Sequence, residues 1–413
     1  MTSSLEPTRS ASRYIALAVA AVCAAVVIAI AASVVPTYAA DLGGNCCADL
    51  EERIAELEAT TARKGNRKVS VTVYGVVNES IMHLSGDGLD GRWAVGPNSN
   101  VESLVGVAGE AVITSGVKAG YVLEIGIGSG NNDSLLGAVG SPFDNSGTGT
   151  YTRRSFGYVA SDTLGKVSVG LNDQATHEIS QISVANTVVA ARMWSLRPIV
   201  GPQIGEALDV FDGSRANLVR YDSPIWNGAQ LSASWATGGV EGLTTGDVWD
   251  VALRWAGEFG GFQAAAGIGY REGIAIPSVG NIGSISIGGT DLIDPNVLSG
   301  SASIKHVDTG FFVNGMAGRL DLGGVVGNAL GDITAWSVQA GNEQKWIALG
   351  KTTLFAEYAD SDIGHANLGL SYWGLGAVQH FDAAALDLYA SYRRYDLEST
   401  NVDFFMAGAA VKF

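Results

Sequence analysis

Apolar side chains recur at every second position in short segments throughout residues 69–413. The segments at 117–128, 249–256 and 386–393 show the pattern most clearly. Successive side chains of a strand point to opposite faces, so a period of two predicts β-strands rather than helices. Gly, Asn, Asp and Ser gather between these segments, where they predict turns. The chain is therefore expected to be all-β.

The two faces of these predicted strands differ in chemistry. One face carries Val, Leu, Ile, Trp and Tyr, whereas the other is rich in Gly and Ser and has few charges. A soluble sandwich exposes its second face to bulk water and usually carries many Lys and Glu residues there. An apolar face bordered by aromatic residues and opposed by a small, wet face is typical of a transmembrane β-barrel. Because unpaired backbone groups are costly in hydrocarbon, such strands must close on themselves.

Composition agrees with a transmembrane antiparallel β-barrel. The chain has 55 Gly among 413 residues, 16% charged residues and 47% hydrophobic residues. Average proteins contain roughly 7% Gly. The net charge of −16 argues against a nucleic-acid partner, because phosphate binding requires clustered Lys and Arg. With about 9 to 11 residues for each membrane strand, residues 69–413 can form 16 strands with ordinary connections.

Residues 1–39 have the features of a secretory signal peptide. Arg9 and Arg13 precede an apolar stretch at 15–35, and residues 37–39 offer small side chains at the two positions that a signal peptidase reads. We expect cleavage directly after this site. A retained transmembrane anchor is the alternative, because the apolar stretch is long enough to span a bilayer.

Residues 40–68 are expected to form a periplasmic leader with a short coiled coil. Its apolar residues have coiled-coil spacing: Leu50, Ile54, Leu57 and Thr61. This segment would act as a modest trimerisation element, and a disordered charged linker is the other interpretation. Cys46 and Cys47 are adjacent, so free thiols, an intersubunit disulfide and a strained vicinal bridge all stay open.

The last segment, residues 401–413, alternates up to the terminal Phe413. Its outer face would carry Phe405 and Val411, whereas Met406 would lie on the opposite, wetter face. We expect this segment to be the closing strand of the barrel, with Phe413 as an interface anchor and a signal for the outer-membrane assembly machinery. Taken alone, the segment also fits a half-buried final strand of a soluble protein.

Residues 215–224 read Arg-Ala-Asn-Leu-Val-Arg-Tyr-Asp-Ser-Pro. This stretch resembles a strand signature of alphaproteobacterial, rhizobial-type outer-membrane porins. Residues 154–171 resemble the preceding hairpin of that family, and residues 350–358 and 376–393 resemble later strands. The resemblance implies a 16-stranded homotrimeric barrel in the Gram-negative outer membrane, in contact with lipid and lipopolysaccharide, with one long loop folded into the lumen.

About 40 residues separate the end of one predicted strand near Asp173 from the next, which begins at Arg215. This connection is long for a hairpin, and the resemblance implies that residues 174–214 are the constriction loop. Its acidic residues are expected to line the pore: Glu178, Glu206, Asp209 and Asp212. Basic residues on the inner faces of the strands would oppose them: Lys118, Arg153, Arg220, Arg254, Arg271 and Arg393. Opposed walls would create a transverse field that orients water and polar solutes. For each arginine taken singly, a solvated rim position or an interstrand ion pair is the alternative.

Motifs for catalysis are weak in this chain. The five His are scattered, and no nucleophile elbow, phosphate-binding loop or metal-ligand spacing stands out. We therefore expect no cofactor, no metal and no enzymatic activity, although an outer-membrane hydrolase would need only a nucleophile and a base brought together in space. The favoured function is a water-filled channel for passive diffusion of small hydrophilic solutes and ions. A solute-specific channel and a structural protein that tethers the envelope through its leader are the alternatives.

Overall fold

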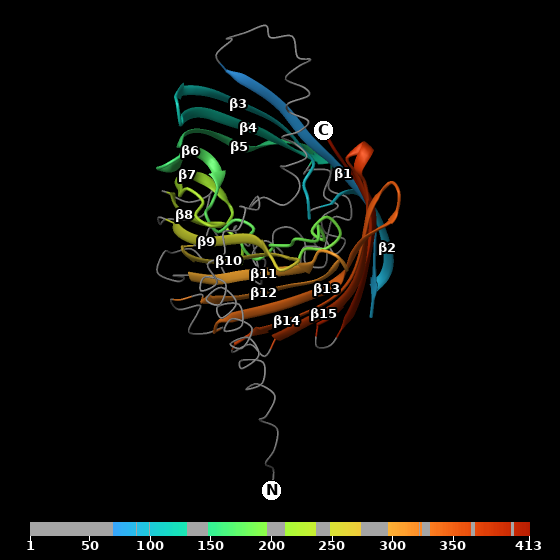
Figure 1. Cartoon of the computed structure of the whole chain (residues 1–413). Helices are drawn as coiled ribbons and strands as arrows, with labels where there is room; N and C mark the ends of the chain where they lie inside the picture. The colour runs from blue at the N-terminus through green and yellow to red at the C-terminus, as the bar shows by residue number, and fades with distance from the viewer. Residues whose placement is uncertain are drawn as a thin grey trace.

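The computed structural model describes residues 69–87, 89–98, 100–129, 148–195, 211–236, 248–273, 296–321, 323, 331–364, 368–397 and 400–413. They form one curved sheet that surrounds a lumen (Figure 1). The predicted signal peptide, the leader with its coiled coil, and both of its cysteines lie outside the described residues. In the described part, no helix has the length and apolar character needed to cross a membrane.

The sheet contains 17 strand segments. They are β1 (Ser70–Gly86), β2 (Leu89–Pro97), β3 (Leu104–Thr114), β4 (Val117–Ser129), β5 (Thr148–Ser161), β6 (Gly165–Asp173), β7 (Arg215–Asp222), β8 (Ala229–Ala236), β9 (Val248–Phe259), β10 (Phe262–Glu272), β11 (Asn296–His306), β12 (Phe311–Asp321), β13 (Ile333–Ile347), β14 (Gly350–Ile363), β15 (Leu368–Phe381), β16 (Leu386–Asp396) and β17 (Asn401–Lys412). A single 3₁₀ turn, η2 (Asp382–Ala384), is described between β15 and β16. From β3 to β17, each strand pairs antiparallel with the next.

The barrel closes where β1 pairs with β17. On the other edge of β1, β2 lies beside its second half and β3 beside its first half, so β2 and β3 together fill one position. The 17 segments therefore make a barrel of 16 strands, as predicted. At the seam, the backbone N–H of Phe413 donates to Gly75 O at 3.0 Å, and Gly75 N–H donates to Phe413 O at 2.8 Å. A Cβ atom at Gly75 would lie 2.5 Å from the Phe413 ring, so glycine is needed where this ring crosses β1.

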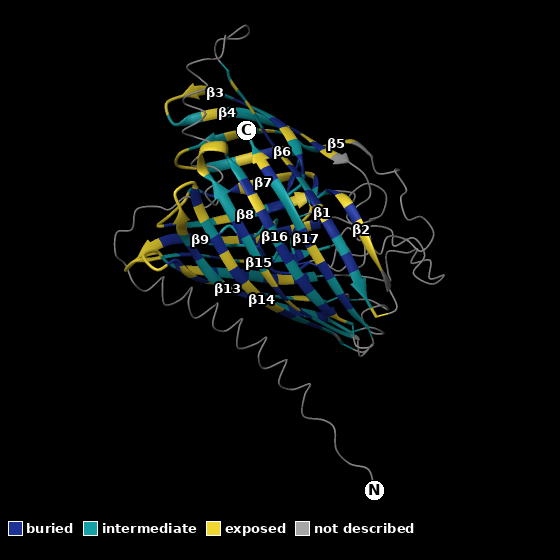
Figure 2. Ribbon diagram, turned by 90° about the vertical axis from the view of Figure 1, so that its right-hand side faces the viewer, coloured by how far each residue is buried: buried dark blue, intermediate teal, exposed yellow. Residues whose placement is uncertain are grey.

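The predicted alternation of faces is visible along the strands (Figure 2). In β4, Leu123 and Ile125 are 49% and 50% exposed, whereas Glu124 between them is 1% exposed. In β8, Leu231 and Trp235 are exposed, whereas Ser232 is buried. The apolar face lies on the outside of the barrel, where lipid can cover it, and the small and polar face lies inside. Burial thus confirms the two faces in these strands.

Aromatic pairs recur on the outer face of the barrel, each formed between two adjacent strands. The rings of Trp249 and Tyr270, of Trp336 and Tyr358, and of Trp373 and Tyr392 each have centroids 5.5 Å apart. The two residues of each pair are diagonal neighbours on adjacent strands. Long aromatic side chains can span the distance between such positions. All three lie in the strand halves farther from the short β9–β10, β13–β14 and β15–β16 connections. They fit an aromatic girdle at a membrane interface.

The inner face of β17 at Met406 is covered by apolar side chains rather than by water. Met406 in β17 is 3% exposed and belongs to a buried apolar cluster with Met82 and Leu84 of β1. The cluster also contains Val189 and Trp194 from the long connection between β6 and β7. The prediction of a wet inner face at Met406 was therefore wrong. Alternation along one strand cannot show that a distant apolar segment covers its inner side.

Candidate functional site

Residues 174–195 run along the inner wall of the barrel. The backbone N–H of Thr176 donates to Asp250 Oδ2 of β9 at 2.6 Å, and the Thr176 hydroxyl donates to the same oxygen at 2.7 Å. Farther along, the Ser301 hydroxyl of β11 donates to the carbonyl of Ile179 at 2.6 Å. Buried polar side chains of the wall thus satisfy the backbone of a segment that has no regular secondary structure.

The middle of this segment continues along the wall. The Thr187 hydroxyl donates to Gln339 Oε1 of β13 at 2.8 Å, and Gln339 Nε2 donates to Ala191 O at 3.2 Å. In β15, the Tyr372 hydroxyl donates to Met193 O at 2.8 Å. The segment therefore follows the inner wall from β8 to β16. Polar side chains on the inner wall were expected to face water in the lumen. In this part of the barrel they instead form hydrogen bonds with the loop.

Four of the six predicted basic residues donate to backbone carbonyls of the loop or of Asp173 at its root: Arg220, Arg254, Arg271 and Arg393. Arg254, for example, reaches Ala175 O at 2.8 Å and His177 O at 2.6 Å. A guanidinium group carries five donors in a planar fork, which suits two carbonyls at once. These four arginines hold the loop backbone, and their role as a basic pore wall opposite acidic loop residues stays a prediction.

Two predicted acidic residues are described, and their environments differ. Asp212 has a side chain that is 8% exposed, pairs with Arg192 at 3.3 Å and accepts the Ser180 backbone N–H at 2.7 Å. It ties the two ends of the loop together. The Glu178 side chain is 58% exposed, and its carboxylate lies 3.9 Å from His177 Nε2. Glu206 and Asp209 fall outside the described residues.

The remaining predicted basic residues also form ion pairs. Lys118, near the short turn between β3 and β4, pairs with Glu110 at 2.9 Å, and both side chains are well exposed. Arg153 in β5 instead belongs to a larger cluster at the root of the loop. The alternative of an interstrand ion pair, stated for each arginine, describes Arg153, and Lys118 forms such a pair as well.

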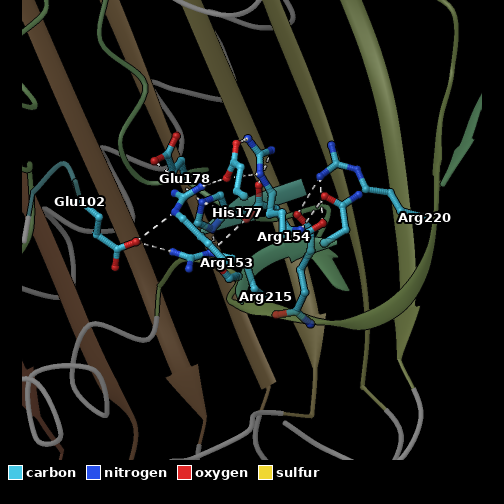
Figure 3. A network of polar contacts seen from close by, with 12 residues as sticks. Glu102, Arg153, Arg154, His177, Glu178, Arg215 and Arg220 are labelled. Carbon is cyan, nitrogen blue, oxygen red and sulfur yellow. Dashed lines mark hydrogen bonds and ion pairs between the residues drawn. The ribbon is translucent and has the colours of Figure 1, made fainter. Parts of the chain in front are cut away.

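The cluster at the loop root is a closed ring of three arginines and three carboxylates (Figure 3). In order around the ring, they are Glu102, Arg153, Glu124, Arg154, Asp173 and Arg215. The N···O distances are 3.0 Å for Glu102–Arg153, 2.6 Å for Arg153–Glu124, 3.1 Å for Arg154–Asp173, 3.4 Å for Asp173–Arg215 and 3.1 Å for Arg215–Glu102, and Arg154 also pairs with Glu124. We call this set the ion-pair ring. Its six charges sum to zero when all are ionised.

Surrounding groups keep Glu102 of the ion-pair ring charged and bind Glu124. Burial by itself raises the pKa of Glu102, but the guanidinium groups of Arg215 and Arg153 outweigh it and lower that pKa to about 2. At Glu124, the Tyr74 hydroxyl donates to Oε1 at 2.7 Å, which adds a neutral donor to two charged ones. Glu102 is therefore ionised at neutral pH, and the ring joins the root of the loop to β4 and β5.

A model of Gram-negative porins matches residues 16–400. The chain belongs to the Gram-negative porin family.

Three solved structures have a similar fold. An anion-selective porin from Comamonas acidovorans has a TM-score of 0.57 at 17% identity, covering 84% of this chain and 100% of that chain. The trimer form of Vibrio cholerae OmpT has a TM-score of 0.55 at 15% identity, covering 84% and 99%. Salmonella typhi OmpF in complex with daunomycin has a TM-score of 0.52 at 13% identity, covering 84% and 98%. Among proteins of curated function, none matches the sequence significantly.

The protein is therefore an outer-membrane channel for passive diffusion, as the sequence predicted. In such barrels, the turns on the periplasmic side are short and the extracellular loops are longer. The short connections of this porin, such as the one between β9 and β10, therefore mark its periplasmic end. The long β6–β7 connection enters the lumen from the extracellular end.

Sequence reasoning missed most of the porin's ion-pair ring. It named Arg153 but not the adjacent Arg154, because neighbours in a regular strand point to opposite faces. In the structure, the pairing of β4 with β5 shifts by one residue there: Glu124 lies opposite Arg154, and Ile125 lies opposite Thr152. Such a bulge brings two consecutive side chains to one face. Two adjacent arginines opposite an inward-facing glutamate were the signal in the sequence.

Proposed function

We propose that this porin is a general diffusion channel whose constriction is formed by residues 174–214. The exposed Glu178 carboxylate would give it a preference for cations. The single observation that carries the preference is the contrast between Glu178 and its neighbours. Its side chain is 58% exposed, whereas the ion-pair ring beside it has no net charge and Asp212 is buried against Arg192.

Electrostatics favour this assignment of roles. Exposed charges act over about 8 to 10 Å at physiological ionic strength, and a balanced ring produces little field at that distance. A permeating ion near the loop would therefore respond more to Glu178 than to the balanced ring. Its backbone has a positive φ of 56°, and the carbonyl of Glu178 accepts the Gln181 N–H at 3.2 Å. This turn fixes where the carboxylate stands. Glu206 and Asp209 belong to the same loop and would add to the preference.

Glu178→Lys is expected to reverse the preference, and Glu178→Gln to weaken it. The measurement is the reversal potential of single channels in planar bilayers under a KCl gradient. We expect the cation-to-anion permeability ratio to fall about twofold for the neutral variant and further for Lys, because removal of one exposed charge changes local ion concentrations by a factor of this size. Asp308→Asn, in the exposed turn between β11 and β12, removes the same charge far from the loop and is the control. Equal reversal potentials in all four proteins would contradict the assignment.

The oligomeric state and the partners form a second part of this proposal. A homotrimer is favoured because one structure with the same fold is a trimer form. Outer-membrane lipid, lipopolysaccharide and the assembly machinery are the proposed partners, with Phe413 as the assembly signal. No enzymatic activity belongs to the proposal, and the resemblance to rhizobial-type porins stays a proposal as well. Comparison of gel mobility before and after heating tests barrel closure and trimerisation together.

A further inference from the structure

The second strand position of the barrel is interrupted in the middle. Pro97, the last residue of β2, lies opposite Glu79 of β1, and Leu104, the first residue of β3, lies opposite Val76. Residues 98–103 therefore stand opposite only two residues of β1. We call the described part of this interruption, Asn98 and residues 100–103, the inner turn.

The inner turn is fixed to β1 through Asn78, which is fully buried. The Asn78 backbone N–H donates to Ser103 Oγ at 2.9 Å, and Asn78 Nδ2 donates to Val101 O at 2.8 Å. The Tyr389 hydroxyl of β16 donates to Asn78 Oδ1 at 2.6 Å. One asparagine thus holds the turn through its backbone and its side-chain nitrogen, while Tyr389 fixes its side-chain oxygen. A segment held in this way is a rigid support.

The inner turn touches the middle of the long loop and, separately, the strand that follows the loop. Asn98 Nδ2 donates to Val189 O in the middle of the loop at 2.7 Å, and this contact is buried. Glu102 pairs with Arg215, the residue that follows the loop, at 3.1 Å, and with Arg153 at 3.0 Å. The hydrogen bonds described above reach the loop from β7 to β16. Asn98 therefore holds the loop from across the β1–β17 seam.

We propose that the inner turn is a second constriction element that fixes the position of the loop and neutralises the arginines at its root. This inference rests on the proposed role of residues 174–214 as the constriction. Without the Asn98 amide, the middle of the loop keeps only its hydrogen bonds to strands on the β16 side of the β1–β17 seam. Without the Glu102 carboxylate, Arg153 and Arg215 stand in the lumen with one negative charge fewer. The first loss affects the steadiness of the current, and the second affects ion selectivity.

The first test is Asn98→Asp. Aspartate keeps the oxygen that accepts the Asn100 N–H at 2.8 Å, but it has no N–H to donate to Val189 O. Loss of one such hydrogen bond raises the population of the detached loop about fivefold. We expect open-channel current noise to rise by a similar factor. Asn100→Asp adds the same charge to the same turn and keeps the Asn98 amide, so its noise should match the wild type.

The second test is Glu102→Gln, which is expected to shift the reversal potential toward anions, with Glu178→Lys recorded in the same series. Unchanged noise in Asn98→Asp together with an unchanged reversal potential in Glu102→Gln would overturn the inner turn as a constriction element. A shift in Glu178→Lys alone would leave the proposed function intact and remove this inference. Effects in Asn98→Asp and Glu102→Gln without any effect of Glu178→Lys would support the inner turn and refute the charge role of Glu178. Heat-dependent gel mobility confirms that each recorded variant is a folded barrel.

Discussion

Replacement of Glu124 by Gln is expected to turn the porin toward anions and to lower its stability strongly. The Glu124 side chain is 1% exposed and pairs with both Arg153 and Arg154 in the ion-pair ring. The substitution gives the ring one net positive charge at the root of the loop. Removal of one partner from a buried ion pair lowers the free energy of unfolding by about 3 kcal/mol or more. Few single changes in this barrel should affect both properties as much.

Two measurements check the Glu124 prediction. Reversal potentials in planar bilayers report selectivity, and thermal unfolding in detergent, followed by gel mobility, reports stability. Glu110→Gln is a matched control, since Glu110 also lies on the lumenal side of its strand but pairs with a well-exposed lysine. Exposed pairs contribute about 0 to 1 kcal/mol, so this control should unfold nearly like the wild type. Indistinguishable unfolding of the two variants would show that the ring does not stabilise the fold.

Arg393→Met is expected to destabilise the barrel and release the end of the described loop segment. Arg393 and Glu357 have side chains 4% and 1% exposed and pair at 2.6 Å. The guanidinium also donates to the carbonyls of Arg192 and Ser195, and it lies 4.6 Å from the Tyr372 ring centroid. Methionine fills part of the space but leaves Glu357 as an unpaired buried charge. The expected loss in free energy of unfolding is about 3 to 5 kcal/mol.

The double variant Arg393→Met with Glu357→Gln separates the two causes. If the unpaired charge dominates, the double variant should be more stable than Arg393→Met, and the remaining deficit measures the lost loop contacts. The adjacent Arg394 points outward, with a side chain 42% exposed and 3.6 Å from Asp403. Arg394→Met should therefore have little effect in the same unfolding assay. Equal losses at positions 393 and 394 would contradict the role given to the inner arginine.

Local pattern was sufficient to predict the architecture. The alternation at 117–128 placed Leu123 and Ile125 on one face, and both are exposed on the outside of the barrel. Because backbone groups in a membrane must pair with each other, strands with this pattern have one way to satisfy them, which is closure. Chain length and strand length allowed 16 strands, and the resemblance to porins implied that number. None of these arguments requires knowledge of which distant residues meet.

The environment of the charged residues could not be predicted in the same way. Period-two counting correctly placed Arg254 and Arg393 inside the barrel. It could not show that their guanidinium groups would donate hydrogen bonds to carbonyls of the loop. It also missed Arg154, whose inward direction depends on a bulge, and the interruption between β2 and β3. These features depend on register between strands. A shift of one residue reverses the direction of a side chain.

The sequence by itself determined that this protein is a lipid-facing β-barrel, because hydrophobic period and backbone pairing act over a few residues. The tertiary structure decided which charges face the lumen and which are neutralised. Glu102 and Arg215 are 113 residues apart in the chain yet hydrogen-bond at 3.1 Å. Coulomb interactions depend on distance in space and on burial, and neither can be read from sequence separation. The selectivity of the channel is therefore a property of the folded lumen.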